Sequence, residues 1–208
     1  MSDLIYIADV IPPENKEEAL SFYYSIFGNR NPITIEIGSG NGHFLVDRAR
    51  ECPGRNFIGT EILNGRAKRF HSKIEKRALE NIVVFKGDAR RFVWEFLFEQ
   101  IVSEFIILFP DPWPKKRHHK HRLLKAAFIN MLHYCLVQGG TVTLATDFPE
   151  YRELILEEFK KNGNFQCTRQ DENSLYPDSY SKTLFQERFE KEGREIYFLK
   201  FRKKNFIR

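Results

Sequence analysis

The chain has 208 residues, of which 42% are hydrophobic and 29% charged, and its formal net charge is +5 at pH 7. This composition can form one packed core and excludes a disordered chain, and no apolar run approaches the roughly 20 residues of a membrane span. Three widely spaced cysteines exclude a disulfide framework and a CxxC zinc site. We therefore expect one cytoplasmic domain over residues 1–208, without a secretory signal, a membrane contact or a metal.

Strand-like and helix-like segments alternate along the chain, which predicts βαβ units and a mostly parallel sheet. The first helix is expected from Glu14 to Phe27, because two prolines precede it and Gly28 follows. Another helix should run from Pro149 to Lys161, and residues 170–181 should form a loop. Trp94 and its aromatic neighbours are expected in the core. The expected strands are Ile33–Ile37, Asn56–Glu61, Ile82–Lys86, Glu104–Leu108, Thr141–Thr146 and Arg194–Lys203.

A glycine-rich turn follows the first of these strands and reads Glu36-Ile-Gly38-Ser-Gly40-Asn-Gly42. Glycines at every second position allow a tight turn and let a ligand approach the backbone. Glu61 ends the next strand, roughly 20 residues on, where an acid that binds a ribose is expected. These features indicate a cofactor that contains adenosine.

The spacing of the turn distinguishes between adenosyl cofactors. A dinucleotide turn reads GxGxxG and holds a pyrophosphate, whereas this turn reads ExGxGxG. Glu36 would repel a pyrophosphate but attract the ammonium group of a methionine. Asp88 follows the third strand, so acids come directly after three successive strands. The pattern resembles the class I S-adenosylmethionine-dependent methyltransferases, in which an acid at the place of Asp88 accepts the adenine amino group. Each acid alone could instead be a helix cap or a surface side chain.

The most unusual stretch follows the fourth strand and reads FPDPWPKKRHH from Phe109 to His119. It sets Asp111 between two prolines, directly ahead of a run of cationic or titratable side chains. Residues 112–146 contain six Lys or Arg and no Asp or Glu, so they contribute +6 to a chain that totals +5. Such a concentration is typical of a surface that binds nucleic acid, although a solvated charge run has the same composition.

This stretch, extended to FPDPWPKKRHHKHRLL, is similar to the signature of the tRNA (guanine-N7-)-methyltransferases of the bacterial TrmB family. The similarity continues through residues 145–151 (ATDFPEY) and 183–188 (TLFQER) and covers about residues 30–203. It implies an α/β single-domain Rossmann-like class I methyltransferase with a helical lead-in over residues 1–30. The sheet would be mostly parallel and seven-stranded, with an antiparallel last strand and helices on both faces. The implied reaction moves a methyl group from S-adenosyl-L-methionine to N7 of guanine 46 in the variable loop of tRNA.

The resemblance also assigns roles to individual residues. Asp111 is expected to be catalytic and to line the cofactor pocket. The other expected cofactor ligands are Glu36, Gly38, Gly40, Gly42, Glu61 and Asp88. The expected substrate contacts are Lys115, Arg117, His118, His119, Lys120, His121, Arg122, Asp147, Thr183, Leu184, Phe185 and Gln186. Two positions depart from the family pattern: His121 replaces a basic Arg, and Gln186-Glu187 leaves open which of the two residues meets the substrate.

Three alternative functions remain open on sequence alone. Enzymes that methylate exocyclic amino groups carry Asp or Asn before Pro-Pro-aromatic, whereas the order here is Asp-Pro-Trp-Pro. An RNA-binding module on a degenerate methyltransferase fold would not need its acids intact, and an NAD-dependent oxidoreductase would have a different turn.

Asp147 could simply cap the next helix, and Trp113 could stack on the target base or cover the core. We expect a monomer or homodimer without an obligate protein partner.

Overall fold

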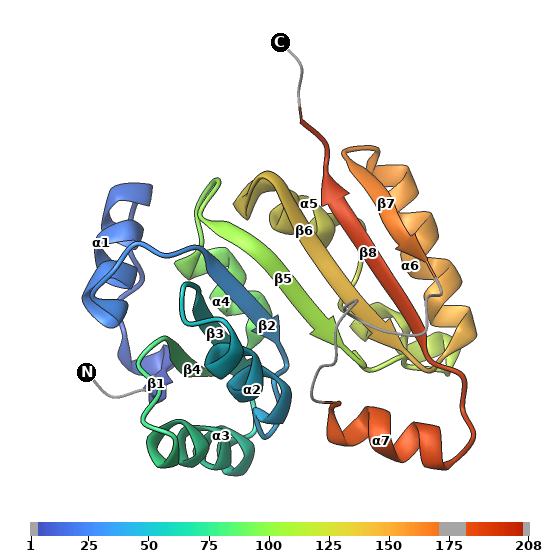
Figure 1. The fold of residues 1–208 in the computed structure, drawn as a ribbon. Helices are drawn as coiled ribbons and strands as arrows, with labels where there is room; N and C mark the ends of the chain where they lie inside the picture. Colours follow the sequence, from blue (N-terminus) through green and yellow to red (C-terminus); the bar gives the residue numbers. More distant parts are fainter. Residues whose placement is uncertain (1–3, 171–181, 206–208) are drawn as a thin grey trace.

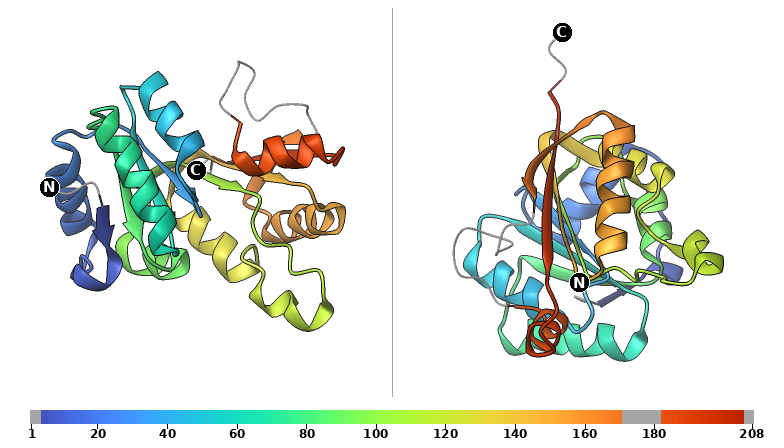
Figure 2. Two further views of the ribbon diagram at one scale, coloured as in Figure 1. Left: turned by 90° about the horizontal axis from the view of Figure 1, so that it is seen from below. Right: turned by 90° about the vertical axis from the view of Figure 1, so that its right-hand side faces the viewer.

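One eight-stranded sheet with helices on both faces organises residues 4–170 and 182–205, the part of the chain that the computed structural model describes (Figures 1 and 2). No helix in this part is long and apolar enough to cross a membrane. The strands are β1 (Leu4–Tyr6), β2 (Ile33–Ile37), β3 (Asn56–Glu61), β4 (Ile82–Lys86), β5 (Val102–Leu108), β6 (Leu136–Thr146), β7 (Phe165–Gln170) and β8 (Tyr197–Lys203). The α-helices are α1 (Lys16–Phe27), α2 (His43–Glu51), α3 (Asn64–Lys76), α4 (Ala89–Phe96), α5 (Ala126–Cys135), α6 (Pro149–Asn162) and α7 (Leu184–Lys191), and the short 3-10 helices are η1 (Ile7–Asp9) and η2 (Lys116–His121).

The strand order, β1-β4-β3-β2-β5-β6-β8-β7, determines where a ligand can bind. The chain lays down β2, β3 and β4 side by side in one direction and then returns to place β5 against the other edge of β2. This reversal creates a topological switch point between β2 and β5. Open α/β sheets bind their ligands outside the carboxyl ends of the strands at such a point.

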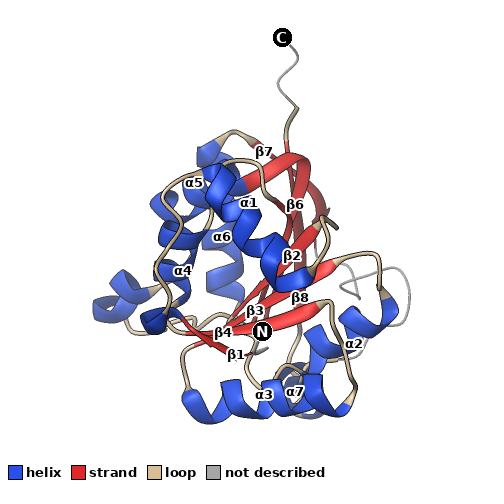
Figure 3. Cartoon of the chain, turned by 90° about the vertical axis from the view of Figure 1, so that its left-hand side faces the viewer, coloured by secondary structure: helices blue, strands red, loops and turns tan. Residues whose placement is uncertain are grey.

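Different helices cover the two faces of the sheet (Figure 3). Helices α1, α4, α5 and α6 pack on one face, against side chains such as Ile35 and Phe105. Helices α2 and α3 pack on the other face, against Phe57 and Val84. Because both faces are covered, the central strands are buried at nearly every position, and all five residues of β2 are buried. A smaller cluster that includes Phe44 lies near the carboxyl end of β5.

The predicted fold class is confirmed, and β2, β3 and β4 have the predicted bounds. The sheet has eight strands rather than seven. The strands named from the sequence omit two of them: β7, which pairs with β8, and β1, which pairs with β4 and has only three residues. Three residues are too few for a recognisable period. Strands β6 and β8 are antiparallel neighbours, as are β7 and β8.

Some predicted boundaries shift, for local reasons. The first helix begins at Lys16 rather than Glu14, because the side-chain oxygen of Asn15 accepts a hydrogen bond from the Glu18 amide at 3.0 Å and caps the helix. Strands β5 and β6 begin earlier than predicted, and β8 begins later. The core prediction for Trp94 is wrong: it is 45% exposed. Residues 171–181 of the predicted loop are not among the residues that the structure describes.

Candidate active site

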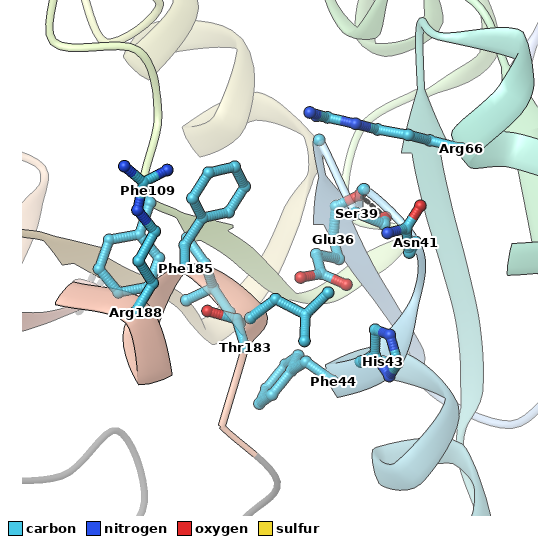
Figure 4. A pocket seen from close by; sticks show the side chains of 14 residues that line it. Glu36, Ser39, Asn41, His43, Phe44, Arg66, Phe109, Thr183, Phe185 and Arg188 are labelled. Atoms are coloured by element: carbon cyan, nitrogen blue, oxygen red, sulfur yellow. Dashed lines mark hydrogen bonds between the residues drawn. The ribbon is translucent and has the colours of Figure 1, made fainter. Parts of the chain in front are cut away.

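Two adjoining cavities open at the switch point, outside the carboxyl ends of β2 and β5. The smaller has a volume of about 790 Å³ including its open mouth, and residues from the glycine turn, α2 and the start of α7 line it (Figure 4). The larger, about 1420 Å³, extends past the ends of β3 and β4. Both cavities are lined by Gly38, Arg66, Leu108, Phe109 and Phe185. They therefore form one continuous crevice.

The glycine turn, residues 38–42, presents bare backbone to this crevice. Its three glycines are left-handed, with φ of 75° at Gly38, 57° at Gly40 and 71° at Gly42. A Cβ atom on Gly42 would lie 2.2 Å from a ring carbon of Phe70, so this position requires glycine on two grounds. A Cβ atom on Gly38 or Gly40 would have no neighbour within 4 Å. The backbone at these two positions is therefore open to a ligand.

Glu36 has its side chain in the smaller cavity (Figure 4), although it is only 3% exposed. One carboxyl oxygen, Oε2, is buried and has no hydrogen-bond partner among the described residues. Burial raises the pKa of Glu36 to about 8; a hydrogen bond from Ser39 opposes this rise, and the nearby charge of Glu61 adds to it. A buried carboxyl oxygen without a partner is costly. The position is therefore suited to a cationic group of a ligand.

Glu61 and Asp88 both line the larger cavity. Glu61 is buried at the end of β3, and its Oε1 accepts a hydrogen bond from the Leu63 amide at 2.7 Å. Asp88 is the N-cap of α4, where Oδ1 accepts from the amides of Arg90 and Arg91. Each acid thus uses one oxygen in a local turn. For Asp88 a helix cap and a ligand contact are compatible, because the cap occupies only Oδ1.

Asp111 lies in a constrained loop that follows β5 and is exposed to the larger cavity. Phe109 and Trp113, on either side of it, have positive φ of 52° and 44°, which side-chain-bearing residues rarely adopt. Arg122 anchors the loop, since its Nε donates to the Pro112 carbonyl at 2.7 Å. Arg122 is only 3% exposed, and its guanidinium lies 5.2 Å from the centre of the Tyr151 ring. Its charge is therefore directed at the loop rather than at solvent.

The basic run, residues 115–122, lies beside this loop. Lys115, Lys116, Arg117 and Lys120 are exposed, and no described carboxylate forms an ion pair with them. His118 and His121 lie against the Trp113 ring, with ring centres 5.7 and 5.1 Å away, and His119 is half-buried. In the described residues, no cluster of three or more potential His, Cys, Asp or Glu ligands could hold a metal ion.

The predicted substrate segment forms the start of α7. Thr183 caps the helix by accepting from the Gln186 amide at 3.0 Å, and the exposed side chains of Leu184 and Phe185 line the smaller cavity. Gln186 is buried and donates from its side chain to Glu190 at 3.0 Å, whereas Glu187 is exposed. The two residues that the sequence could not separate therefore face different surroundings.

Asp147 lies outside both cavities in an ion pair. Its Oδ2 atom is 2.8 Å from a guanidinium nitrogen of Arg194, which also pairs with Glu192. Asp147 does not provide the N-cap of α6, because the N-cap residue is Phe148. A substrate contact by Asp147 would thus require Arg194 to release it.

Several residues that line the smaller cavity were absent from the sequence prediction. They are Ser39, Asn41, His43, Phe44, Arg66, Leu108, Phe109 and Arg188 (Figure 4). Arg66 could have been found from the sequence. It is the first of several basic residues in the helix-like segment that follows Glu61. Burial, followed by the charge of Lys73, lowers the pKa of His43 and so favours its neutral form.

Comparison with known proteins gives relatives that cover most of the chain. Residues 30–199 match the model of a family described as "Putative methyltransferase". A tRNA (guanine-N(7)-)-methyltransferase of Chlamydia felis is 35% identical, with 86% of this chain and 79% of the relative covered. One from Nitrosococcus oceani is 34% identical, with 86% and 75% covered. The fold is similar to that of the 16S rRNA methyltransferase KamB, with a TM-score of 0.67 at 12% identity over 97% of this chain and 99% of that one.

At 12% identity, the structural likeness concerns the fold alone, but the two sequence relatives are similar to most of the chain. The methyl donor of such enzymes is S-adenosyl-L-methionine. This chain belongs to the family of tRNA (guanine-N(7)-)-methyltransferases.

Proposed function

We propose that the protein transfers the methyl group of S-adenosyl-L-methionine to N7 of guanine 46 in the variable loop of tRNA and so forms 7-methylguanosine. The observation that carries the proposal is that Asp111 opens onto the same crevice as the buried Glu36 and the glycine turn. The relatives from Chlamydia felis and Nitrosococcus oceani are tRNA (guanine-N(7)-)-methyltransferases, which supports the same reaction here.

The crevice fits the cofactor by charge and shape. The unpartnered oxygen of Glu36 suits the methionine ammonium group, and the open backbone at Gly38 and Gly40 leaves room for a close approach. Glu61 retains a second oxygen for ribose hydroxyls, and Asp88 retains one for the adenine amino group. The cofactor, when bound, supplies an electrophilic methyl group on a positively charged sulfur.

The chemistry of the acceptor explains why the crevice needs no strong base. Guanine N7 carries an in-plane lone pair and no proton, so it can attack a methyl group directly. The protein must then align N7 and stabilise the positive charge that the purine acquires. We assign this role to the carboxylate of Asp111, which can also accept from guanine N1–H and the amino group. Adenine lacks a donor at N1 and would be rejected. Phe109 and Trp113 have rarely adopted φ angles, which persist only where surrounding contacts hold the backbone, and the Arg122 anchor supplies such a contact for this loop.

The tRNA backbone should meet the basic run. Lys115, Arg117 and Lys120 are exposed and without carboxylate partners among the described residues, as phosphate contacts require, and His118, His119 and His121 can add sugar or phosphate contacts. Arg122 belongs to the same run in sequence, but its burial supports a positioning role. In that role it would hold the loop around Asp111 in place.

Asp147 and the start of α7 complete the proposed substrate side. Phe109 packs against Phe185 and Phe189 of α7, with ring centres 6.5 and 5.5 Å apart, so this helix lies against the loop of Asp111. Thr183, Leu184 and Phe185 would contact the nucleotide. Asp147 would exchange Arg194 for the substrate. Because Gln186 is buried and bonded to Glu190, Glu187 is the better placed of the two for a contact outside the protein.

Other properties of the proposed enzyme remain predictions from the sequence. We propose that residues 1–208 act as one methyltransferase domain, with residues 1–30 as a lead-in, and that the enzyme works in the cytoplasm. It would act as a monomer or homodimer without an obligate protein partner.

Identification of the modified nucleoside tests the function. The protein is incubated with an unmodified tRNA transcript and labelled cofactor, the RNA is digested, and the labelled nucleoside is identified. We expect 7-methylguanosine from position 46. N6-methyladenosine or N4-methylcytidine would instead indicate an amino-directed enzyme, and absence of cofactor binding by calorimetry would indicate an RNA-binding module.

Substitution of Asp111 tests its catalytic role. Asp111→Ala should still bind the cofactor but lose about 100-fold to 1000-fold in the rate of transfer, as expected when a charge-stabilising group is removed. Asp9→Ala, which removes an exposed carboxylate on η1, serves as the control. An Asp111→Ala protein that keeps near-normal transfer would exclude the assigned role.

A further inference from the structure

Helix α3 carries a second concentration of positive charge, separate from the basic run. Residues 64–77 contain six Lys or Arg and one Glu, so they have a net charge of +5, as large as that of the whole chain. This helix lies in a different part of the sequence from the basic run, which follows Asp111. Its charge requires its own explanation.

Most of these charges lie on one side of the helix. Arg66, Arg69, Lys73 and Lys76 are spaced by three, four and three residues, so they form a single line along the helix, called here the α3 stripe. The buried residues of α3, Ala67, Phe70 and Ile74, occupy the neighbouring face toward the sheet. Lys68 has the same charge but is turned about 100° from Arg69 around the helix, off the line of the stripe, which makes it a natural control.

The α3 stripe begins at the crevice itself. Arg66 lines both cavities, so its side chain lies at their junction (Figure 4). Lys73 donates to the carbonyl oxygen of Asn41 in the glycine turn at 2.7 Å, and Arg69 donates to the Asn41 side chain at 3.4 Å. The stripe therefore runs from the mouth of the crevice past the glycine turn.

The charges of the α3 stripe are not neutralised within the described residues. None of its four members forms an ion pair there, whereas exposed cations on other helices do, such as Lys161 with Glu157 on α6. Burial and the nearby charges of Arg77 and Arg69 lower the pKa of Lys73 to about 8, with Asp47 opposing. Crowded positive charge of this kind is relieved when an anion binds.

The α3 stripe and the basic run approach the crevice from different sides. In Figure 2 (left), α3 (teal) lies at the left of the view and η2 (yellow-green) at the lower right, well apart from it. Consistent with this view, α3 packs on the face covered by α2, whereas Arg90 of α4, on the other face, donates to the carbonyl oxygen of His121 at 2.9 Å. A polyanion that spans the crevice could therefore meet positive charge at both edges.

We propose that the α3 stripe binds the phosphate backbone of the tRNA on the side of the crevice opposite the basic run, so that the target nucleotide enters between two backbone contacts. The inference rests on the proposed tRNA substrate. Phosphate contacts at both edges would hold the strand while one base leaves the stack, an arrangement that favours extrusion of the base. The contacts should be insensitive to sequence and should weaken with salt.

The test compares two pairs of substitutions in the full-length protein. Arg69→Gln/Lys76→Gln removes two charges from the α3 stripe, and Lys68→Gln/Lys160→Gln removes two exposed charges elsewhere. Binding of an unmodified tRNA transcript is measured by fluorescence anisotropy between about 50 and 200 mM salt. Each lost phosphate contact should reduce the slope of log affinity against log salt by about 0.7 to 0.9. The loss of affinity over this salt range should therefore be about 10-fold smaller for the stripe variant than for the wild type.

Two further readouts separate the possible failures. Cofactor affinity and the unfolding midpoint should stay at wild-type values in both variants, and the stripe variant should show a raised KM for tRNA with little change in kcat. A stripe variant with the salt dependence of the wild type overturns this inference and leaves the proposed reaction intact. The wild type could instead form no 7-methylguanosine while the stripe variant still has a smaller salt slope of tRNA binding. The proposed reaction would then be wrong, but the α3 stripe would still be a nucleic-acid-binding surface. An equal effect of the control pair would overturn the inference, because the response would then be non-specific.

Discussion

Replacing Glu36 by Gln tests whether the crevice uses a buried carboxyl group to bind a cation. With its pKa at about 8, the carboxyl group is protonated in about 90% of molecules at pH 7 before the cofactor binds. Pairing with the methionine ammonium group favours the ionised form, so binding should release about 0.9 proton per cofactor at this pH. Glu36→Gln keeps nearly the same volume but cannot ionise, so we expect its binding to be weaker and without this release.

The magnitude of the pKa shift also predicts how stability depends on pH. One pKa unit corresponds to about 1.4 kcal/mol, so the rise from 4.5 to about 8 corresponds to roughly 5 kcal/mol for ionising Glu36 without a cation. Between these pH values the folded state holds more protons than the unfolded state. The free energy of unfolding in the absence of cofactor should therefore fall as pH rises through this window, and Glu36→Gln should remove that fall.

Isothermal titration calorimetry measures the proton release directly, in buffers of equal pH and different ionisation enthalpy. Denaturant unfolding between about pH 5 and pH 9 measures the stability profile. Glu80→Gln, which removes an exposed carboxylate on the loop after α3, is the matched control and should behave as the wild type. If the wild type released no proton, or if Glu36→Gln released as many, the assigned role of Glu36 would be refuted.

Three substitutions test the parts that support the crevice. Gly42→Ala should lower the free energy of unfolding by about 2 to 4 kcal/mol and weaken cofactor binding. The reason is that the φ angle of Gly42 is 71° and the added Cβ atom would lie 2.2 Å from Phe70. Wild-type stability in denaturant unfolding would contradict this prediction. Arg194→Ala should change stability by less than about 1 kcal/mol and lower the KM for tRNA by freeing Asp147, whereas a raised KM would mean that Arg194 itself binds the substrate. Arg122→Lys keeps the charge but loses the guanidinium geometry, so kcat should fall while the salt slope of tRNA binding stays unchanged. A reduced slope would instead mean that Arg122 contacts a phosphate of the tRNA.

The parts of the crevice that depend on local patterns could be predicted from the sequence. Strand bounds and the glycine turn follow from apolar runs and glycine spacing, so Glu36, Glu61 and Asp111 could be assigned to the ends of their strands from the sequence alone. The carboxyl ends of parallel strands share one edge, which explains why these acids were expected together. The same reasoning did not include β1, because three residues carry too little pattern.

Other features depend on contacts that a local pattern cannot reveal. Arg122 belongs to a charge run in sequence, but its side chain turns inward onto Tyr151 and the Pro112 carbonyl. The pairing of Asp147 with Arg194 joins residues that follow β6 and precede β8, which are far apart in sequence. In contrast, the α3 stripe is visible in the sequence at helical spacing, but the run after Asp111 is the more conspicuous concentration of charge.

The most direct measurement of the central claim uses a tRNA transcript that carries 7-deazaguanine at position 46. This change replaces N7 with a carbon that has no lone pair and leaves the Watson–Crick edge intact. We expect full methyl transfer to the normal transcript, unchanged affinity for the modified one and no transfer to it. Methyl transfer to the 7-deaza transcript at a rate comparable with the normal one would rule out the proposed reaction, because the acceptor atom could not then be N7 of guanine 46.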